Sequence, residues 1–248
     1  MSRSREVAGR TICVTGASSG IGRAIAEHLG VRGGHVFMAG RTQASLEESA
    51  AKIVDAGGAA EVATFDVADS PALQNWIRGA AESTGRLDVL VNNAGFGDVG
   101  ATIADGDPAV WQSMLEVNVL ALAVGCQAAI HSMRATGSEG NIINISSVAA
   151  IRRESGVYGA TKHAVNCINS SLRQELEGDP IRVTSIMPGV FATNFSRHLD
   201  RSVIESMAES VGIDHLAFDE QDRLPQAQLD QFQSAMPPVY GDPRHIAD

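Results

Sequence analysis

The stretch TGASSGIGRA at residues 15–24 joins an apolar run to an amphipathic run through a turn with three glycines. The apolar TICVT, which ends at the same threonine, predicts a strand, and GIGRAIAEHLGVRG predicts a helix over 20–33. The first N–H groups of a helix are unpaired and carry partial positive charge. Glycine lets a phosphate group approach that backbone closely. Gly16, Gly20 and Gly22 therefore predict a turn that binds a pyrophosphate.

The same alternation of strand and helix continues along the chain. Short β-branched runs predict further strands over 35–39, 60–67, 87–95, 141–147 and 181–189. Amphipathic runs between them predict helices over 43–57, 71–85 (capped by Ser70), 108–135 and 157–178. Because the strands are too apolar to face water, we expect an α/β fold with a doubly wound parallel sheet, helices on both faces and right-handed crossovers.

The bulk composition limits the class of protein. We expect residues 1–248 to form a single domain, because this length suits one sizeable core. A net charge of −10 opposes binding to nucleic acid. Cys13, Cys126 and Cys167 are widely spaced in apolar surroundings, which favours buried thiols over disulfides or a metal site. The longest apolar stretch, from Val117, has about 14 residues and is too short for a bilayer, so we expect a cytoplasmic protein with no membrane partner.

The chain becomes polar and irregular from about 190 to 238. We interpret this segment as a lid, part helix and part loop, that covers the substrate over the carboxyl ends of the strands. Ligands of open α/β sheets bind at that edge. A disordered excursion remains the alternative interpretation.

The end of the second expected strand bears on the choice of nucleotide. A protein that binds NAD usually holds an acidic residue here, which accepts the ribose hydroxyls. Gly40 offers none, whereas the Arg41 guanidinium suits a 2′-phosphate. We therefore expect NADP(H), bound in part by Arg41 and Thr42, with an ordinary surface arginine as the alternative. The ends of the next two strands are expected to meet the adenosine, through Asp66, Val67, Asn92, Asn93, Ala94 and Gly95.

Tyr158 and Lys162 are four residues apart on an expected helix and therefore share one face. A free tyrosine titrates at roughly pH 10, and a nearby ammonium lowers that pKa by stabilising the phenolate. Such a tyrosine can give a proton to a carbonyl oxygen as hydride arrives, or take one in the reverse direction. Ser146 and Ser147 end the preceding strand, where one hydroxyl can hold the same oxygen.

These motifs together resemble the short-chain dehydrogenase/reductase family. TGASSGIG, NNAG, Asn118, ISS, YGATK and MPGVFAT come in the family's order and approximate spacing, from about residue 11 to residue 193. The resemblance implies a Rossmann-like fold with a seven-stranded sheet, a homodimer or homotetramer, and no metal. It also implies oxidoreduction of a small alcohol or carbonyl substrate.

The resemblance implies a role for each matching residue. Tyr158 resembles the general acid/base, and Lys162 resembles the residue that binds the nicotinamide ribose and lowers the tyrosine pKa. Ser147 resembles the residue that orients the carbonyl, and Asn118 the one that supports a proton-relay water. The pyrophosphate turn would also include Ser18, Ser19 and Ile21, and the nicotinamide carboxamide would meet Pro188, Gly189 and Thr193.

The sequence departs from the family pattern at two places. Ser147 precedes Tyr158 by 11 residues, slightly fewer than is usual in the family, so Ser146 stays an alternative. PRHIAD at 243–248 resembles the opening of the family's last core helix. We therefore expect the rest of that helix and the last strand to be absent, either because the sequence is a fragment or because the fold ends early with an uncovered sheet edge. These departures keep a second hypothesis open, a catalytically weak NADP(H)-binding regulatory protein of the same fold.

The side chains expected near the substrate are mostly apolar. They lie in the 148–157 loop, near 96–99 and in the lid, and include Val148, Ile151, Val157, Phe191 and Phe195. Such a lining favours small or medium-sized hydrophobic carbonyl compounds. The expected use of NADP(H) favours reduction as the direction in the cell.

Overall fold

The computed structural model describes residues 7–98, 102–189 and 201–210, together with 212–213, 216–218, 225 and 228. Thr193, Phe191, Phe195 and most of the expected lid lie outside the described residues. One helix of the lid segment is described, α7 (Arg201–Ser210). The role of the segment as a lid and the extent of a single domain remain predictions.

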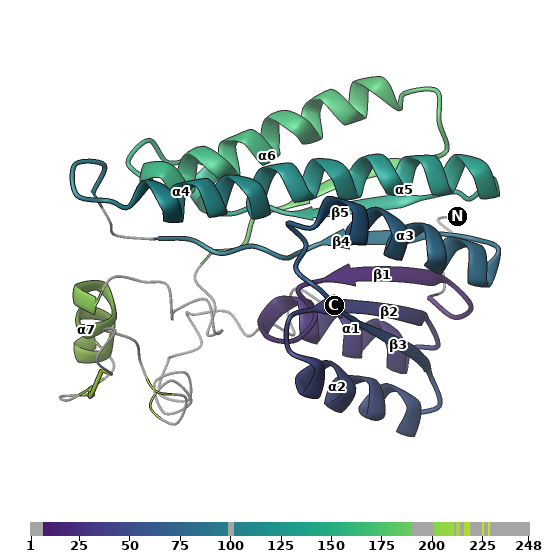
Figure 1. Ribbon diagram of the computed structural model, residues 1–248, viewed down its shortest axis with the longest axis horizontal. Helices are drawn as coiled ribbons and strands as arrows, with labels where there is room; N and C mark the ends of the chain where they lie inside the picture. The colour runs from purple at the N-terminus through teal and green to yellow at the C-terminus, as the bar shows by residue number, and fades with distance from the viewer. Residues whose placement is uncertain are drawn as a thin grey trace, which may run out of the picture.

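Six strands of the described residues form one parallel sheet at the centre of the molecule (Figure 1). Their spatial order is β3-β2-β1-β4-β5-β6, so the chain moves outward from β1 in one direction and outward from β4 in the other. This is the doubly wound order of Rossmann folds, and it confirms the expected fold class. The strands are β1 (Thr11–Thr15), β2 (His35–Gly40), β3 (Ala59–Thr64), β4 (Val89–Asn92), β5 (Asn141–Ile145) and β6 (Arg182–Ile186).

Helices cover both faces of the sheet, as expected. On the lower face in Figure 1 lie α1 (Gly20–Val31) and α2 (Gln43–Asp55). The other face carries α3 (Ser70–Thr84), α4 (Pro108–Leu115), α5 (Leu122–Thr136) and α6 (Gly156–Glu175). The alternation of β1 side chains explains the two layers, because Ile12 and Val14 pack with α1 and α2 while Cys13 packs with α3 and α5.

The edge strand β3 corrects the expectation that every strand avoids water. Four of its six residues are exposed, among them Glu61 and Val62. Among the strands of the described residues, β3 pairs with β2 alone and so forms one edge of the sheet. It also ends at Thr64, earlier than expected, which leaves Asp66 and Val67 in the turn that follows.

The helix expected over 108–135 is a continuous rod with a π-helical turn in its middle. That turn, Glu116–Ala121, lies between α4 and α5 and contains Asn118. By length and composition alone, Pro108–Thr136 has the apolar character of a membrane span, because its most apolar window has a mean hydropathy of 1.6. The shorter stretch seen in the sequence did not indicate this. Half of its most apolar window is buried, and α5 packs on α3 and the sheet, as in the core helix of a globular protein.

Two smaller expectations are wrong. The cap of α3 is Asp69 rather than Ser70, because the Asp69 carboxylate accepts a hydrogen bond from the Ala72 N–H at 3.0 Å. Cys167 is exposed on α6, whereas Cys13 and Cys126 are buried as expected. The apolar residues near Cys167 in the sequence therefore lie on the buried face of α6, and Cys167 lies on its exposed face.

Asp88 ties together the amino-terminal ends of β1 and β4. Its side chain is 2% exposed and accepts hydrogen bonds from Arg10 at 2.7 Å, Arg86 at 2.6 and 2.7 Å and the Thr11 N–H at 2.9 Å. Burial acts to raise the pKa of Asp88, but the hydrogen bonds from Arg86, Arg10 and Thr11 outweigh it and hold the pKa below its ordinary value.

Asp88→Asn is expected to lower the free energy of unfolding by about 2–4 kcal/mol at neutral pH, as measured by urea denaturation. The folded pKa is depressed, so the contribution of Asp88 is fully present above the ordinary aspartate pKa of about 4. It is lost as the pH falls through the lower folded value. The wild-type and variant stabilities should therefore converge in acid.

Asp179→Asn is the matched control, because it removes a more exposed ion pair with Arg134 at 2.8 Å. Its cost should be much smaller than that of Asp88→Asn, because exposed ion pairs contribute little to stability. Equal losses in the two variants would contradict the assignment of Asp88 as the buried anchor.

Candidate active site

The turns that follow β1 and β4 are joined at the carboxyl edge of the sheet. The Thr15 hydroxyl accepts hydrogen bonds from the N–H groups of Asn93 at 3.0 Å and Ala94 at 3.1 Å. The Asn93 side-chain amide donates to the backbone oxygens of Thr15 at 3.0 Å and Gly16 at 3.2 Å. The two turns therefore form one unit at the point where the strand order reverses, the place where doubly wound sheets bind ligands.

The glycine turn has the backbone that its sequence predicts. Gly16 and Gly20 have φ angles of 64° and 57°, which side chains with a Cβ rarely adopt. A Cβ on Gly22 would overlap the Asn93 amide and the Gly16 carbonyl oxygen. Ser19 is the N-cap residue of α1, yet its side chain makes no capping hydrogen bond. The first N–H groups of this 12-residue helix thus lack a side-chain cap, which fits a bound pyrophosphate.

The residues predicted to bind the pyrophosphate are accessible, and the end of β2 lies close to them. Ser18, Ser19, Gly20 and Ile21 are partly exposed along the turn itself. At the end of β2, a Cβ on Gly40 would lie 3.0 Å from the Ser18 hydroxyl oxygen, so the two segments are in close contact.

Arg41 and Thr42 follow Gly40 on the surface. The Arg41 side chain is 75% exposed, and its Nη1 lies 3.9 Å from the Asp66 carboxylate. This long ion pair is weak in solvent and leaves most of the guanidinium accessible.

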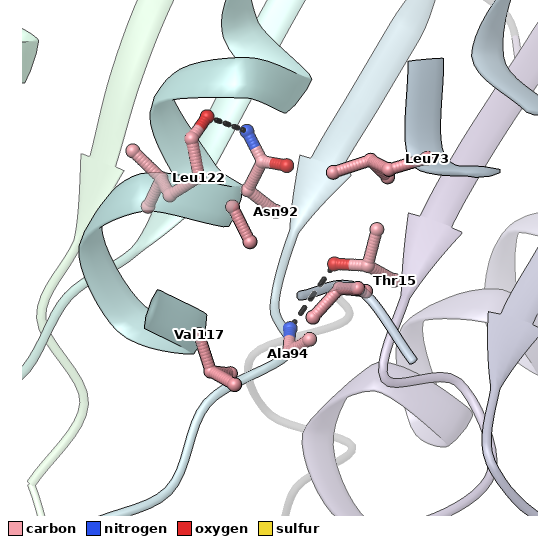
Figure 2. A pocket seen from close by; sticks show the side chains of 8 residues that line it. Thr15, Leu73, Asn92, Ala94, Val117 and Leu122 are labelled. Atoms are coloured by element: carbon pink, nitrogen blue, oxygen red, sulfur yellow. Dashed lines mark hydrogen bonds between the residues drawn. The ribbon is translucent and has the colours of Figure 1, made fainter. Parts of the chain in front are cut away.

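A small cavity lies beside the joined turns, between the ends of β1 and β4 and the long helix (Figure 2). The centre of a water molecule can occupy about 10 Å³ of it, which is room for about one water. Its lining includes Val67, so this predicted adenine contact points its side chain into the core. The cavity residues are Thr15, Val67, Leu73, Asn92, Ala94, Val117, Ala121 and Leu122.

Tyr158 and Lys162 lie on the buried face of α6, with 8% and 5% of their surfaces exposed. Burial raises the pKa of Tyr158, and a hydrogen bond with the Ser147 side chain acts to lower it. The Lys162 ammonium donates to the Ile145 carbonyl oxygen at 3.0 Å and lies 5.9 Å from the centroid of the Tyr158 ring. The pKa of Tyr158 is raised overall, with burial as the largest cause, and the expected lowering of that pKa by Lys162 remains a prediction.

The two candidate serines occupy different environments. Ser146 is 3% exposed, and its hydroxyl donates to the backbone oxygen of Lys162 at 3.4 Å. Ser147 is partly exposed and begins the 3₁₀ helix Val148–Ile151, where its hydroxyl accepts a hydrogen bond from the Ala149 N–H at 3.1 Å. Ser147 is the serine that is hydrogen-bonded to Tyr158. The segment between Ser147 and Tyr158, although slightly shorter than is usual in the family that the sequence resembles, therefore still brings the expected serine to the tyrosine.

Asn118 joins the loop after β4 to α6. Its Oδ1 accepts from the Phe96 N–H at 3.0 Å, and its Nδ2 donates to the Phe96 carbonyl at 2.7 Å and the Thr161 hydroxyl at 3.1 Å. These contacts fix the Asn118 side chain between the loop after β4 and α6, and its support of a proton-relay water remains a prediction. Thr161 was missed in the sequence, although YGATK contains it, because a single helical threonine gives no signal of its partner.

The turn after β6 approaches the same place. The Pro188 carbonyl accepts a hydrogen bond from the Val148 N–H at 3.0 Å, which links this turn to the segment after Ser147. Pro188 is buried and Gly189 is exposed. Within the described ranges, no three His, Cys, Asp or Glu side chains gather as a metal site would require.

The sequence profile described as short chain dehydrogenase matches residues 10–203. The chain belongs to the short-chain dehydrogenase/reductase family. An uncharacterized oxidoreductase of Staphylococcus saprophyticus is 36% identical to it over 198 residues, which are 79% of this chain and 84% of that protein. This short-chain dehydrogenase is therefore an oxidoreductase by family.

Solved structures agree on the fold. A metagenomic short-chain oxidoreductase in complex with NADP has a TM-score of 0.69 and 37% identity, covering 74% of this chain and 83% of its own. A short-chain dehydrogenase/reductase of Burkholderia phymatum in complex with NAD has a TM-score of 0.77 and 25% identity, covering 98% of this chain and 84% of its own.

The burial of Lys162 in this short-chain dehydrogenase predicts a pH-dependent stability. Burial lowers its pKa from the ordinary 10.5 to about 8. The folded protein therefore binds fewer protons than the unfolded chain between these values, so the free energy of unfolding should rise with pH across this window. The rise should be on the order of 2–3 kcal/mol relative to Lys162→Met, measured by urea denaturation at several pH values. Parallel pH profiles of the two proteins would contradict the buried ammonium.

Proposed function

We propose that this short-chain dehydrogenase interconverts an alcohol and a ketone or aldehyde with NADP(H), using Tyr158 as general acid/base. The observation that carries the proposal is the hydrogen-bonded pair of Ser147 and Tyr158 side chains beside the buried Lys162. When bound, the nicotinamide supplies or accepts the hydride. The Ser147 hydroxyl donates to the carbonyl oxygen, and the Tyr158 hydroxyl donates to the same oxygen and transfers its proton.

Lys162 supports this proton transfer through its charge and its donors. An ammonium carries three N–H donors, and one of them is used by the Ile145 carbonyl. The others can bind the nicotinamide ribose at the carboxyl edge of the sheet. The charge, 5.9 Å from the Tyr158 ring centroid, stabilises the phenolate that forms when the proton leaves.

The preference for NADP(H) is assigned to Arg41. Its exposed guanidinium follows the strand that lacks an acid at Gly40, and Ser18 lies beside that strand end. A guanidinium fork matches a phosphate group in shape and charge. Because similar folds are known with NADP and with NAD, the side chains at this strand end are proposed to decide between them. Asp66, Thr42, Asn93, Ala94 and Gly95 are proposed as the remaining contacts of the adenosine half.

The proposal extends to the substrate and the assembly. Ile151, which closely follows Ser147 along the chain, is 69% exposed, which favours a small hydrophobic carbonyl compound as substrate.

Leu115 and Leu120 are 49% and 54% exposed at the junctions of the long helix, and such apolar side chains are suited to packing against a second copy. We propose a homodimer or homotetramer that works in the cytoplasm, with the lid segment contributing to the substrate site.

Tyr158→Phe is expected to retain NADPH affinity and to lose at least about a thousandfold in turnover, because the ring remains and the proton donor is gone. NADPH oxidation would be followed with a panel of ketones and aldehydes, and NADPH binding by fluorescence titration. Ser147→Ala should also lose about a hundredfold or more. The matched control Ser146→Ala, whose hydroxyl donates to the backbone oxygen of Lys162, should lose little.

Retained turnover in Tyr158→Phe would overturn the assigned acid/base. Equal losses for the two serine variants would overturn the assignment of Ser147. NADPH binding by the wild type with no turnover across the panel would favour the regulatory alternative.

Arg41→Asp should weaken NADPH binding by about ten- to a hundredfold and leave NADH binding nearly unchanged, because only NADPH carries the 2′-phosphate. Parallel fluorescence titrations with the two nucleotides measure the effect. Arg78→Asp on α3 is the control for the change in net charge, because Arg78 is also an exposed arginine and lies 3.7 Å from the carboxylate of Glu82. An unchanged NADPH affinity in Arg41→Asp would contradict the assignment.

A further inference from the structure

The backbone at Gly97 lies directly against the ring of Tyr158. Gly97 is buried, and a Cβ added to it would lie 2.5 Å from Cδ2, 2.8 Å from Cγ and 2.9 Å from Cε2 of the tyrosine. Real Cβ atoms do not approach ring carbons so closely, since carbon atoms in contact are about 3.5–4.0 Å apart. The φ of Gly97 is outside the positive range, so its backbone alone would accept alanine. The position requires glycine because of the ring.

The segment around Gly97 is held from both sides. Asn118 binds both backbone groups of Phe96, at 3.0 and 2.7 Å. On the other side, the Asp98 N–H donates to the sulfur of Met114 at 3.4 Å. Because both anchors lie on the long helix, the backbone at Gly97 cannot easily retreat from the tyrosine.

The tyrosine is also held by other contacts. Its helix is linked to the loop through Asn118, which donates to Thr161 and bonds to the backbone of Phe96, and its hydroxyl is hydrogen-bonded to Ser147. The ring is therefore enclosed between α6, Ser147 and the Gly97 backbone, with 8% of the residue exposed. Catalytic groups held in this way keep their reactive atoms in place, whereas a displacement of about 1 Å can cost about a hundredfold in rate.

We propose that Gly97 is a positioning residue for Tyr158. Because Gly97 has no side chain, the ring packs directly against its backbone, and this contact sets where the ring lies. Gly97 touches neither substrate nor nucleotide in this role and acts through the tyrosine. The consequence for turnover rests on the proposed function of Tyr158. The placement of the ring rests on the structure alone and is tested separately.

The test replaces Gly97 by alanine and follows the ring without any substrate. The chain has two tyrosines, so Tyr240→Phe leaves Tyr158 as the only site for fluorotyrosine. Gly97→Ala in this background should shift the fluorine magnetic resonance signal of residue 158. The control Gly79→Ala, which places its methyl in open space on α3, should leave the signal at the wild-type position. An unshifted signal in Gly97→Ala overturns the proposal.

Kinetics supply the second measurement. With a carbonyl compound that the wild type reduces, Gly97→Ala should lower kcat at least about tenfold, while KM and the Kd for NADPH change less than about twofold. A general weakening of the fold would instead lower the thermal midpoint and NADPH binding together, and that result overturns the positioning role. If the wild type reduces no compound, the proposed function fails while the fluorine experiment still decides the role of Gly97.

A double variant keeps the proposal testable if Gly97→Ala does not fold. Removing the ring with Tyr158→Ala makes room for the new methyl group. Gly97→Ala combined with Tyr158→Ala should therefore fold and melt close to Tyr158→Ala alone. A double variant that still fails to fold shows that the methyl group meets something other than the ring, and overturns the proposal.

Discussion

The interaction on which the site depends is the joining of two strand ends by Thr15 and Asn93. Each side chain bonds to the backbone of the other turn, so the glycine turn after β1 and the NNAG turn after β4 keep a fixed relation. The parallel pairing of β1 with β4 brings these ends to one edge. To hold one nucleotide, the sites for its pyrophosphate and its nicotinamide must lie a fixed distance apart. The hydrogen bonds of Thr15 and Asn93 hold the two turns at such a fixed distance.

The proposed catalytic half is built on the same frame through the long helix. The π-helical turn carries Asn118 toward the loop after β4 and toward Thr161 on α6. Extra turns of this kind are often found where a helix must aim one side chain at a functional site. The helix that supplies much of the core thereby also sets the spacing between the loop at Gly97 and the tyrosine.

Burial governs the electrostatics of the proposed pair. Tyr158 and Lys162 are both removed from water, which favours the neutral form of each. The Ser147 hydrogen bond acts in the opposite direction on the tyrosine. Lys162 uses one N–H donor at the Ile145 carbonyl, and its other donors suit the proposed binding of ribose hydroxyls and a forming phenolate.

The sequence by itself determined the alternation of strands and helices, the glycine turn, and the identity of Tyr158, Lys162 and the two candidate serines. These are local patterns, since hydrophobic period, turn glycines and the four-residue spacing are all written within short stretches. Only the tertiary structure decided which serine meets the tyrosine, which partners Asn118 takes, that β3 is an exposed edge, and that the segment at Gly97 lies against the tyrosine ring. Those facts depend on contacts between residues far apart in the chain, such as Asn118 with Thr161 and Gly97 with Tyr158, and no local pattern specifies them.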